Sequence, residues 1–513
     1  MKFNIKLEFI KNKLLYVLRL IILILALNAC NNDSEPIIDV VENVEISEFS
    51  FLTLNNPNLL SNVYLSIEGN KIIGRIPQNI DVSELIANFE FSGSSIAVNN
   101  VPQTSAITKN DFTGIVSYTV KSSSGAQISY EIDVTKFTGL PIIYLSTNQN
   151  APIDSKEDYV DGSIIIDGGR NFNSLNDSSM KIRGRGNSTW YVHPKKPYQL
   201  KLSDEHEFLG MPSEKKWLFL AEYSDKTMMR NSIAFEMGYL SNLDWTPESN
   251  FVEVYLNDSY NGTYNITQKV EEGISRVNLE GSGYLLEIDQ FDRLDADDVY
   301  FHTGNFLINI KEPELELNSN EYNYVKNLLN EFETNLYSSQ FKHPTEGYAN
   351  YIDVDSFIDW YLISEITKNQ DSKSFSSIFL NVIPGQKIKM GPLWDFDLSF
   401  GNVNYSECEL ATGFWVKDHK WYSRLFEDES FVEKVKTRFN YFKENEIYIL
   451  DKMDFYANQL KWSQQENDMV WETLGIYVWP NPVVYNTYEE EVSHLKSWYS
   501  ERMSWLDNAF SSL

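Results

Sequence analysis

The run Trp394-Asp395-Phe396-Asp397-Leu398-Ser399-Phe400-Gly401-Asn402 ends a predicted short strand with two carboxylates and a Gly-Asn turn. The preceding residues 387–393, Lys-Ile-Lys-Met-Gly-Pro-Leu, supply the apolar part of that strand. Side chains at i and i+2 of an extended chain leave on the same side, so both carboxylates would point one way. Hard cations such as Mg²⁺ take oxygen ligands of this kind. The run therefore predicts Asp395 and Asp397 as metal ligands, or alternatively as two solvated carboxylates.

A third carboxylate, Asp371, lies on a different predicted element. It belongs to Asn369-Gln370-Asp371, directly after residues 354–367, whose pattern predicts a helix. The 6 histidines are scattered and show neither His-x-x-x-His nor Cys-His spacing, which argues against zinc hydrolysis. The chain therefore offers three carboxylates from two elements as its candidate site.

Further motifs stand in order between residues 140 and 513. They are Arg183-Gly184-Arg185-Gly186-Asn187-Ser188-Thr189-Trp190, Lys195-Lys196-Pro197-Tyr198-Gln199-Leu200-Lys201-Leu202, Lys216 to Leu220 with Asp225 and Met229-Arg230-Asn231, Tyr284 to Asp289, Asn369 with Asp371, and the 394–402 run. This ordered set resembles the CotH kinase family, the atypical protein kinases named after spore coat protein H. The resemblance implies a two-lobed kinase-like fold and ATP-dependent phosphoryl transfer to protein hydroxyls, with Ser and Thr as the expected acceptors.

The resemblance also assigns roles to the carboxylates. Asp371 would orient or deprotonate the acceptor hydroxyl, and Asp395 with Asp397 would hold Mg²⁺ or Mn²⁺ against the phosphates of ATP. In ordinary kinases an Asn five residues after the catalytic Asp binds a second metal, but this position is Ser376. Asn369 is therefore expected to substitute, unless Asp397 holds the second metal or that metal is absent.

The expected nucleotide contacts come from residues 184–240. In the loop 184–197, two glycines and the basic side chains Arg185, Lys195 and Lys196 could cradle phosphates, and Asn187 belongs to the same motif. The alternative is a plain hairpin. Lys201 is the expected phosphate lysine, although Lys196 and Lys216 remain alternatives. Glu236, the only carboxylate inside the predicted helix 227–240, would be its ion-pair partner or else a solvated surface residue.

Residues 1–30 are expected to be an export signal. Basic residues precede a short apolar run at 20–27, which is too short for a permanent membrane span. Leu27-Asn28-Ala29-Cys30 resembles a bacterial lipobox, which implies cleavage before Cys30 and lipidation of its thiol; an ordinary secretory signal or an uncleaved anchor is the alternative. The acidic-polar start of the 31–36 tether resembles the signals that send lipoproteins to the outer face of the outer membrane. We therefore expect an exported, surface-facing protein anchored to the membrane through Cys30.

Composition limits the partners. The formal net charge of −30 leaves no basic footprint, which argues against a nucleic-acid partner. With Cys30 lipidated, Cys408 stands alone, so no disulfide framework is expected. A hydrophobic content of 42% is enough for two or three cores.

The predicted fold class is α+β, in two parts. Residues 37–138 alternate in short stretches at 46–52, 63–67, 71–76, 87–91, 116–120 and 128–134, which predicts an all-β immunoglobulin-like sandwich. Residues 140–513 would form the kinase-like domain, with strands first and predicted helices at 322–337, 354–367, 431–443, 447–464 and 488–510.

A second function of a different class stays open. ATP is scarce outside the cell, and Ser376 departs from the kinase pattern. The chain could therefore be a catalytically weak or inactive kinase-like scaffold for surface adhesion or assembly. The three acids weigh against this alternative, because a pure scaffold does not need them.

Overall fold

The structure is a computed structural model that describes residues 44–59, 62–78, 80–169, 171–373 and 375–513. The chain divides into two compact units, Met1–Lys136 and Phe137–Leu513. The expected export signal at 1–30, its Cys30 and the tether at 31–36 lie outside the described residues. None of the helices formed by the described residues combines the length and the apolar character that crossing a membrane requires.

The first unit is built from strands that face one buried core. One sheet has the order β2 (Val63–Tyr64), β1 (Glu45–Phe51) and β6 (Asn88–Ser92). The other has the order β3 (Ser66–Glu68), β4 (Lys71–Pro77), β11 (Gln127–Phe137), β10 (Val116–Lys121), β7 (Ser95–Val98) and β8 (Val101–Pro102). A small pair, β5 (Leu85–Ile86) and β9 (Lys109–Asn110), completes the unit.

Aromatic side chains from both sheets fill that core. Phe49 of β1 packs edge-to-face on Tyr118 of β10, with ring centroids 5.2 Å apart. Both side chains are buried, as are Phe51 and Ile72. The six predicted stretches coincide with β1, with β2 and β3, and with β4, β6, β10 and β11, because one face of each sheet must be apolar to cover the core. The strands β5, β7, β8 and β9 were not predicted.

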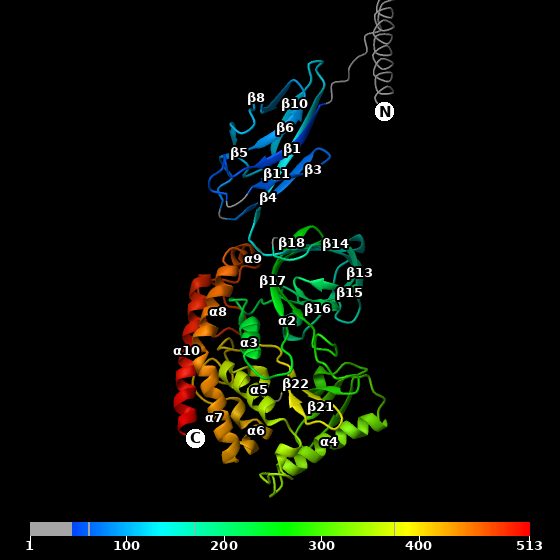
Figure 1. Cartoon of the computed structure of the whole chain (residues 1–513), viewed down its shortest axis with the longest axis vertical. Coiled ribbons are helices and arrows are strands. Elements are labelled where there is room, and N and C mark those ends of the chain that lie inside the picture. Colours follow the sequence, from blue (N-terminus) through cyan, green and yellow to red (C-terminus); the bar gives the residue numbers. More distant parts are fainter. Residues whose placement is uncertain (1–43, 60–61, 79, 170, 374) are drawn as a thin grey trace, which may run out of the picture. The chain divides into compact units, whose positions relative to one another are not determined.

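The second unit begins with a closed barrel (Figure 1). Its strand order is β12 (Ile142–Thr147), β13 (Val160–Asp167), β14 (Leu175–Gly184), β15 (Tyr198–Phe208), β16 (Met211–Leu220), β18 (Ser259–Gln268) and β17 (Ser249–Leu256). The parallel pairing of β12 with β17 closes it. Leu200 and Leu202 face the buried interior, whereas Lys201 between them is exposed.

Two helices interrupt the barrel strands. The predicted 184–197 loop contains the short α2 (Ser188–Val192), between β14 and β15. The second helix, α3 (Arg230–Tyr239), follows β16 and is buried along nearly its whole length. It begins three residues later than predicted, at Arg230, whose backbone N–H donates to Asp225 Oδ2 at 2.8 Å.

A five-stranded sheet and the remaining helices form the rest of the unit. The sheet has the order β20 (Val299–His302), β21 (Leu307–Glu312), β19 (Tyr284–Asp289), β22 (Ile378–Val382) and β23 (Lys389–Met390). The helices are α4 (Asn320–Leu336), α5 (Val354–Thr367), α6 (Lys420–Leu425), α7 (Glu429–Glu444), α8 (Glu446–Gln459), α9 (Ser463–Trp471) and α10 (Tyr488–Ser511). In Figure 1, α10 runs alongside α7 and α8, and it contacts both.

One predicted helix, 447–464, is wrong in its extent. The chain leaves the helix after Gln459 and starts again as α9 at Ser463. The reason is tertiary: the carbonyl of Ser463 accepts a hydrogen bond from Thr263 Oγ1 at 3.2 Å, and Asn467 Oδ1 accepts one from Lys195 Nζ at 2.8 Å. Packing of α9 against β18 therefore sets a new helix direction that the periodicity did not reveal. The described residues as a whole form an α+β protein.

Candidate functional site

The two acids of the 394–402 run meet in an irregular turn. The strand β23 already ends at Met390, so the expectation that a strand delivers both carboxylates is wrong. Asp395 instead adopts the left-handed backbone region, with φ 62°. Its carboxyl is in hydrogen-bond contact with that of Asp397, and Ser377 Oγ lies 3.5 Å from Asp395 Oδ2. Sparsely populated backbone at a polar residue is common at functional sites, because the surroundings must hold it in place.

Asp371 reaches this turn from the end of α5. It lies in a single 3₁₀ turn, Gln370–Ser372, directly after the helix. Two backbone hydrogen bonds join the segments, from Gln370 N to Leu398 O at 3.1 Å and from Phe400 N to Thr367 O at 2.7 Å. The structure therefore brings the three predicted acids together from two elements.

Asn369 links the two segments rather than pointing at a ligand. Its Nδ2 donates to the Asp395 carbonyl at 3.0 Å, and its Oδ1 accepts from Asp371 N at 3.2 Å. The side chain is buried and both ends of its amide are engaged with backbone. The expected role of Asn369 as a metal ligand is therefore corrected to a structural one.

Burial and mutual repulsion hold protons on the acids. Burial raises the pKa of Asp371 to about 7, and the neighbouring Asp395 adds to the shift. Burial also raises the pKa of Asp395, and burial with the charges of Asp395 and Glu222 raises the pKa of Asp397 well above its usual range. A bound cation would replace this repulsion by attraction, which is the usual role of closely spaced carboxylates.

Two guanidinium groups flank the acids. Arg185 follows β14, lies over the Trp394 ring at 5.5 Å and interacts with the charges of Asp395 and Asp397. Arg293 ends the 3₁₀ helix Phe291–Arg293, and its charge acts on Asp371 and Asp395. Within the described part of the chain, neither guanidinium takes part in an ion pair shorter than 4.0 Å. Both are therefore free to bind an anion beside the acids.

Strand pairing explains the position of Arg293. The strand β19 pairs antiparallel with β22, with Ile288 opposite Ile378. The backbone N–H of Ser377, just before β22, donates to Glu287 Oε1 at 2.8 Å. The segment that follows β19 is thus next to the segment that follows Asp371.

The other predicted nucleotide residues lie elsewhere. Lys201 is exposed on the outer face of the barrel, opposite Lys181 and Lys216 on the neighbouring strands. Lys196 Nζ donates to the carbonyls of Trp190 and His193, both at 2.6 Å. These two lysines therefore have no contact that ties them to the acids.

Two further predicted contacts need correction. Asn187 is exposed, and its Oδ1 accepts from Lys156 Nζ at 3.0 Å. Glu236 does not pair with a phosphate lysine: its Oε1 lies 2.9 Å from Lys452 Nζ, and Tyr448 donates to its Oε2 at 2.6 Å. The helix α3 turns Glu236 toward α8, so of the predicted nucleotide residues only Arg185 lies beside the acids.

Sequence reasoning missed four residues at the site. Glu222 precedes Asp225 in the segment after β16, Asn231 lies in the first turn of α3, Ser377 precedes β22, and Arg293 stands alone among acids in the 289–298 loop. Two signals were available in the sequence: Asn231 belongs to the motif Met229-Arg230-Asn231, and Arg293 is the only basic residue in an acidic loop.

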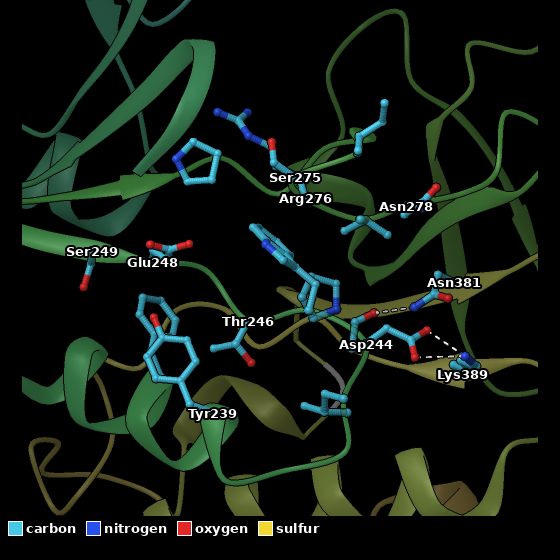
Figure 2. A pocket seen from close by; sticks show the side chains of 18 of the residues that line it. Tyr239, Asp244, Thr246, Glu248, Ser249, Ser275, Arg276, Asn278, Asn381 and Lys389 are labelled. Carbon is cyan, nitrogen blue, oxygen red and sulfur yellow. Dashed lines mark hydrogen bonds and ion pairs between the residues drawn. The ribbon is translucent and has the colours of Figure 1, made fainter. Parts of the chain in front are cut away.

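One large cavity lies apart from the acids. It measures about 1020 Å³, and neither Asp371, Asp395 nor Asp397 lines it. Figure 2 shows Asp244 turned toward Lys389, and Asp244 Oδ2 lies 2.7 Å from Lys389 Nζ. Other polar side chains around it, such as those of Ser275 and Asn381, also bond to protein atoms. We therefore do not assign the chemistry to this cavity.

The turn that carries Asp395 and Asp397, here called the acid turn, could bind a hard divalent cation that needs few protein ligands. Across the ranges that the structure describes, no group of three or more His, Cys, Asp or Glu side chains is arranged to hold a metal ion. Mg²⁺ commonly uses one or two carboxylates and completes its shell with waters and substrate phosphates. Asp395 and Asp397, with two guanidinium groups beside them, fit that arrangement.

Comparison with known proteins adds one family and one distant structure. A family model described as CotH kinase protein matches residues 182–506. No curated protein matches the sequence. Among matching solved structures is a crystal structure from Bacteroides thetaiotaomicron, described as a proposed glycoside hydrolase, with 10% identity over 58% of this chain and 89% of that chain and a TM-score of 0.17. A similarity this low does not bear on function.

Proposed function

This chain belongs to the CotH kinase protein family, and from this premise we propose that it is an ATP- and metal-dependent kinase. It would transfer phosphate to hydroxyl groups, chiefly of Ser and Thr, on exported or cell-surface proteins. Family membership supports a kinase-like function, and the site supplies the candidate residues.

The observation that supports the proposal most is the meeting of Asp371 with the 394–402 turn. Three carboxyls from two elements lie together, and Asn369 joins the two segments through their backbone. The charges of Arg185 and Arg293 act on the acids, and neither guanidinium has an ion-pair partner among the described residues. Phosphoryl transfer depends mainly on positioning and on neutralising charge, and carboxylates for a metal with arginines for phosphates are the groups that it needs.

Each group then has a role. Asp395 and Asp397 would hold Mg²⁺ or Mn²⁺, which supplies positive charge next to the phosphates when bound. Arg185 and Arg293 would donate hydrogen bonds to phosphate oxygens. Asp371 would orient the acceptor hydroxyl and accept its proton.

The proposed reaction is a displacement at the γ-phosphorus of ATP. The acceptor oxygen forms a bond to the γ-phosphorus, and the bond between that phosphorus and the β,γ-bridging oxygen breaks. The bridging oxygen keeps the electron pair, so ADP leaves, and the hydroxyl proton passes to a carboxylate oxygen of Asp371. Since burial raises the pKa of Asp371 to about 7, this carboxyl is poised to accept a proton near neutral pH.

The proposal includes a kinase-like division of the second unit. The barrel β12–β18 with α3 would be the small lobe, and the sheet β19–β23 with α4–α10 the large lobe. The first unit, with its two facing sheets, would be an immunoglobulin-like spacer. The Cys30 region would be processed as a lipoprotein signal and place the kinase on the outer face of the outer membrane.

The test is calorimetric binding of ATP to the full chain with Mg²⁺ or Mn²⁺, beside Asp395→Ala. Asp258→Asn is a matched control, because Asp258 is an exposed acid in the turn between β17 and β18. Transfer is then followed with ATP labelled on either the γ- or the α-phosphate, which separates phosphoryl from nucleotidyl transfer.

We expect metal-dependent ATP binding that Asp395→Ala removes and Asp258→Asn retains. Label from the γ-phosphate should appear on protein. If neither metal supports binding, the kinase proposal fails and the adhesion scaffold becomes the working description.

A further inference from the structure

We propose that Glu222 and Asn231 are positioning residues that hold the peptide group between Asp395 and Phe396 in place. This inference rests on the proposed function in one respect, namely that Asp395 and Asp397 hold a metal. The hydrogen bonds that Asn231 makes to Phe396 and to Glu222, here called the clamp, do not depend on a metal. They link α3 to the acid turn.

The peptide group that follows Asp395 is held at both of its ends. Its carbonyl accepts from Asn369 Nδ2 at 3.0 Å, and its N–H, on Phe396, donates to Asn231 Oδ1 at 2.7 Å. Asn369 lies after α5 and Asn231 lies in the first turn of α3, so the two asparagines come from different parts of the second unit. Asn231, Asn369 and Phe396 are buried, whereas Asp395 is half-buried.

Holding this peptide group fixes ψ of Asp395 and φ of Phe396, and so the path of the backbone from Asp395 to Asp397. Asp395 itself has a φ of 62°, in the left-handed backbone region that residues other than Gly rarely adopt. A rotation of this peptide group would change ψ of Asp395 and φ of Phe396, and it would move the side chains of Asp395 and Asp397 relative to each other. Both hydrogen bonds oppose that rotation.

Glu222 determines which way the Asn231 amide faces. Asn231 Nδ2 donates to Glu222 Oε1 at 3.1 Å and to Oε2 at 3.4 Å. Asn265 Nδ2 also donates to Glu222 Oε1, at 3.4 Å, from β18. With the NH₂ end of Asn231 directed at Glu222, only its oxygen is left for the Phe396 N–H. Without an acceptor at position 222, the amide can turn over and present its NH₂ group to that N–H, where no hydrogen bond forms.

The test compares leucine and conservative variants of the full chain. Glu222→Leu removes the acceptor, while Glu222→Gln keeps an Oε1 oxygen in its place. Asn231→Leu removes the contact with Phe396, and Asn508→Ala on the exposed face of α10 serves as control. Hydrogen exchange of the Phe396 amide is measured by mass spectrometry, and binding of Mn²⁺ alone by calorimetry.

Glu222→Leu and Asn231→Leu should speed exchange at Phe396 and weaken Mn²⁺ binding by roughly 10–100-fold, the usual effect of losing a residue that orients a metal ligand. Glu222→Gln and Asn508→Ala should leave both quantities near those of the unaltered chain. If a leucine variant does not fold, Asn231→Ser, whose side chain is too short to bridge the two partners, takes its place with the same expectation.

Unchanged exchange at Phe396 in Asn231→Leu would overturn the proposal. Faster exchange with unchanged Mn²⁺ affinity would also overturn it, because the clamp would then not position the acids. If the unaltered chain binds no Mn²⁺, the metal part of the proposed function fails separately, while the exchange data still show whether Glu222 and Asn231 hold the turn.

Discussion

Replacing Arg502 by Met should destabilise the second unit more than any surface change on the same helix. Arg502 lies on α10 with no exposed side-chain surface, and its Nη2 is 2.6 Å from Glu365 Oε1 on α5, which is equally buried. The guanidinium also donates to the carbonyls of Ala411 and Gly413, at 3.0 and 2.6 Å. The variant would leave a buried carboxylate without its cation and two carbonyls without a donor.

The expected loss follows from that geometry. Removing one partner of a buried ion pair costs about 3–5 kcal/mol, because the remaining charge stays desolvated. With an unfolding entropy of about 2.1 cal/mol/K per residue, residues 137–513 give roughly 0.8 kcal/mol/K, so Tm should fall by about 4–6 °C. Part of the cost is offset because Glu365 also accepts backbone N–H bonds from Trp415, Val416 and Lys417 at 2.7 to 2.9 Å.

The assay is urea and thermal unfolding of the full chain, followed by circular dichroism and calorimetry. Lys496→Met is the matched control: it lies on the same helix and pairs with Asp454 at 2.6 Å, but both side chains are partly exposed. Such surface pairs contribute about 0–1 kcal/mol. If Arg502→Met lost less than about 1 kcal/mol, or no more than Lys496→Met, the assignment of Arg502 as a buried structural cation would be refuted.

Three further predictions concern the site. Asp371→Asn should raise the free energy of unfolding by up to about 4 kcal/mol at pH 8 and leave it nearly unchanged at pH 3, since a carboxyl whose folded pKa is raised to about 7 costs stability only as pH rises above its unfolded pKa; denaturant unfolding at the two pH values checks this. Mn²⁺ affinity should rise with pH, because burial raises the pKa of Asp395 and of Asp397 and the metal must displace their protons; proton release measured calorimetrically in buffers of different ionisation enthalpy checks it, and pH-independent binding would contradict it. Arg293→Ala should weaken ATP binding by about tenfold, the loss of roughly one charge-assisted hydrogen bond; Arg183→Ala, which removes a guanidinium stacked on Tyr159, should leave the affinity unchanged.

Local signals in the sequence were sufficient for much of the fold. The helix predicted at 354–367 is α5, bounded by Asp353, whose side chain accepts from Ser356 N at 2.9 Å, and by Lys368 in the left-handed region. Caps and apolar periodicity act within one or two turns, so they can be recognised in the chain alone. The same local reasoning joined α8 and α9 into one helix, because the contact with β18 that separates them is distant in sequence.

The sequence by itself indicated the three acids of the site, since Asp371 follows a predicted helix and Asp395 and Asp397 stand two residues apart in one short run. Alternation also correctly placed Lys201 opposite the core, but closure of the barrel put that face on its outer surface. Only the tertiary structure decided that Arg293, Glu222 and Asn231 lie at the acids, because strand pairing and the packing of α3 bring together segments far apart in the chain. Such long-range contacts follow from the summed burial of many side chains, and no local pattern encodes them.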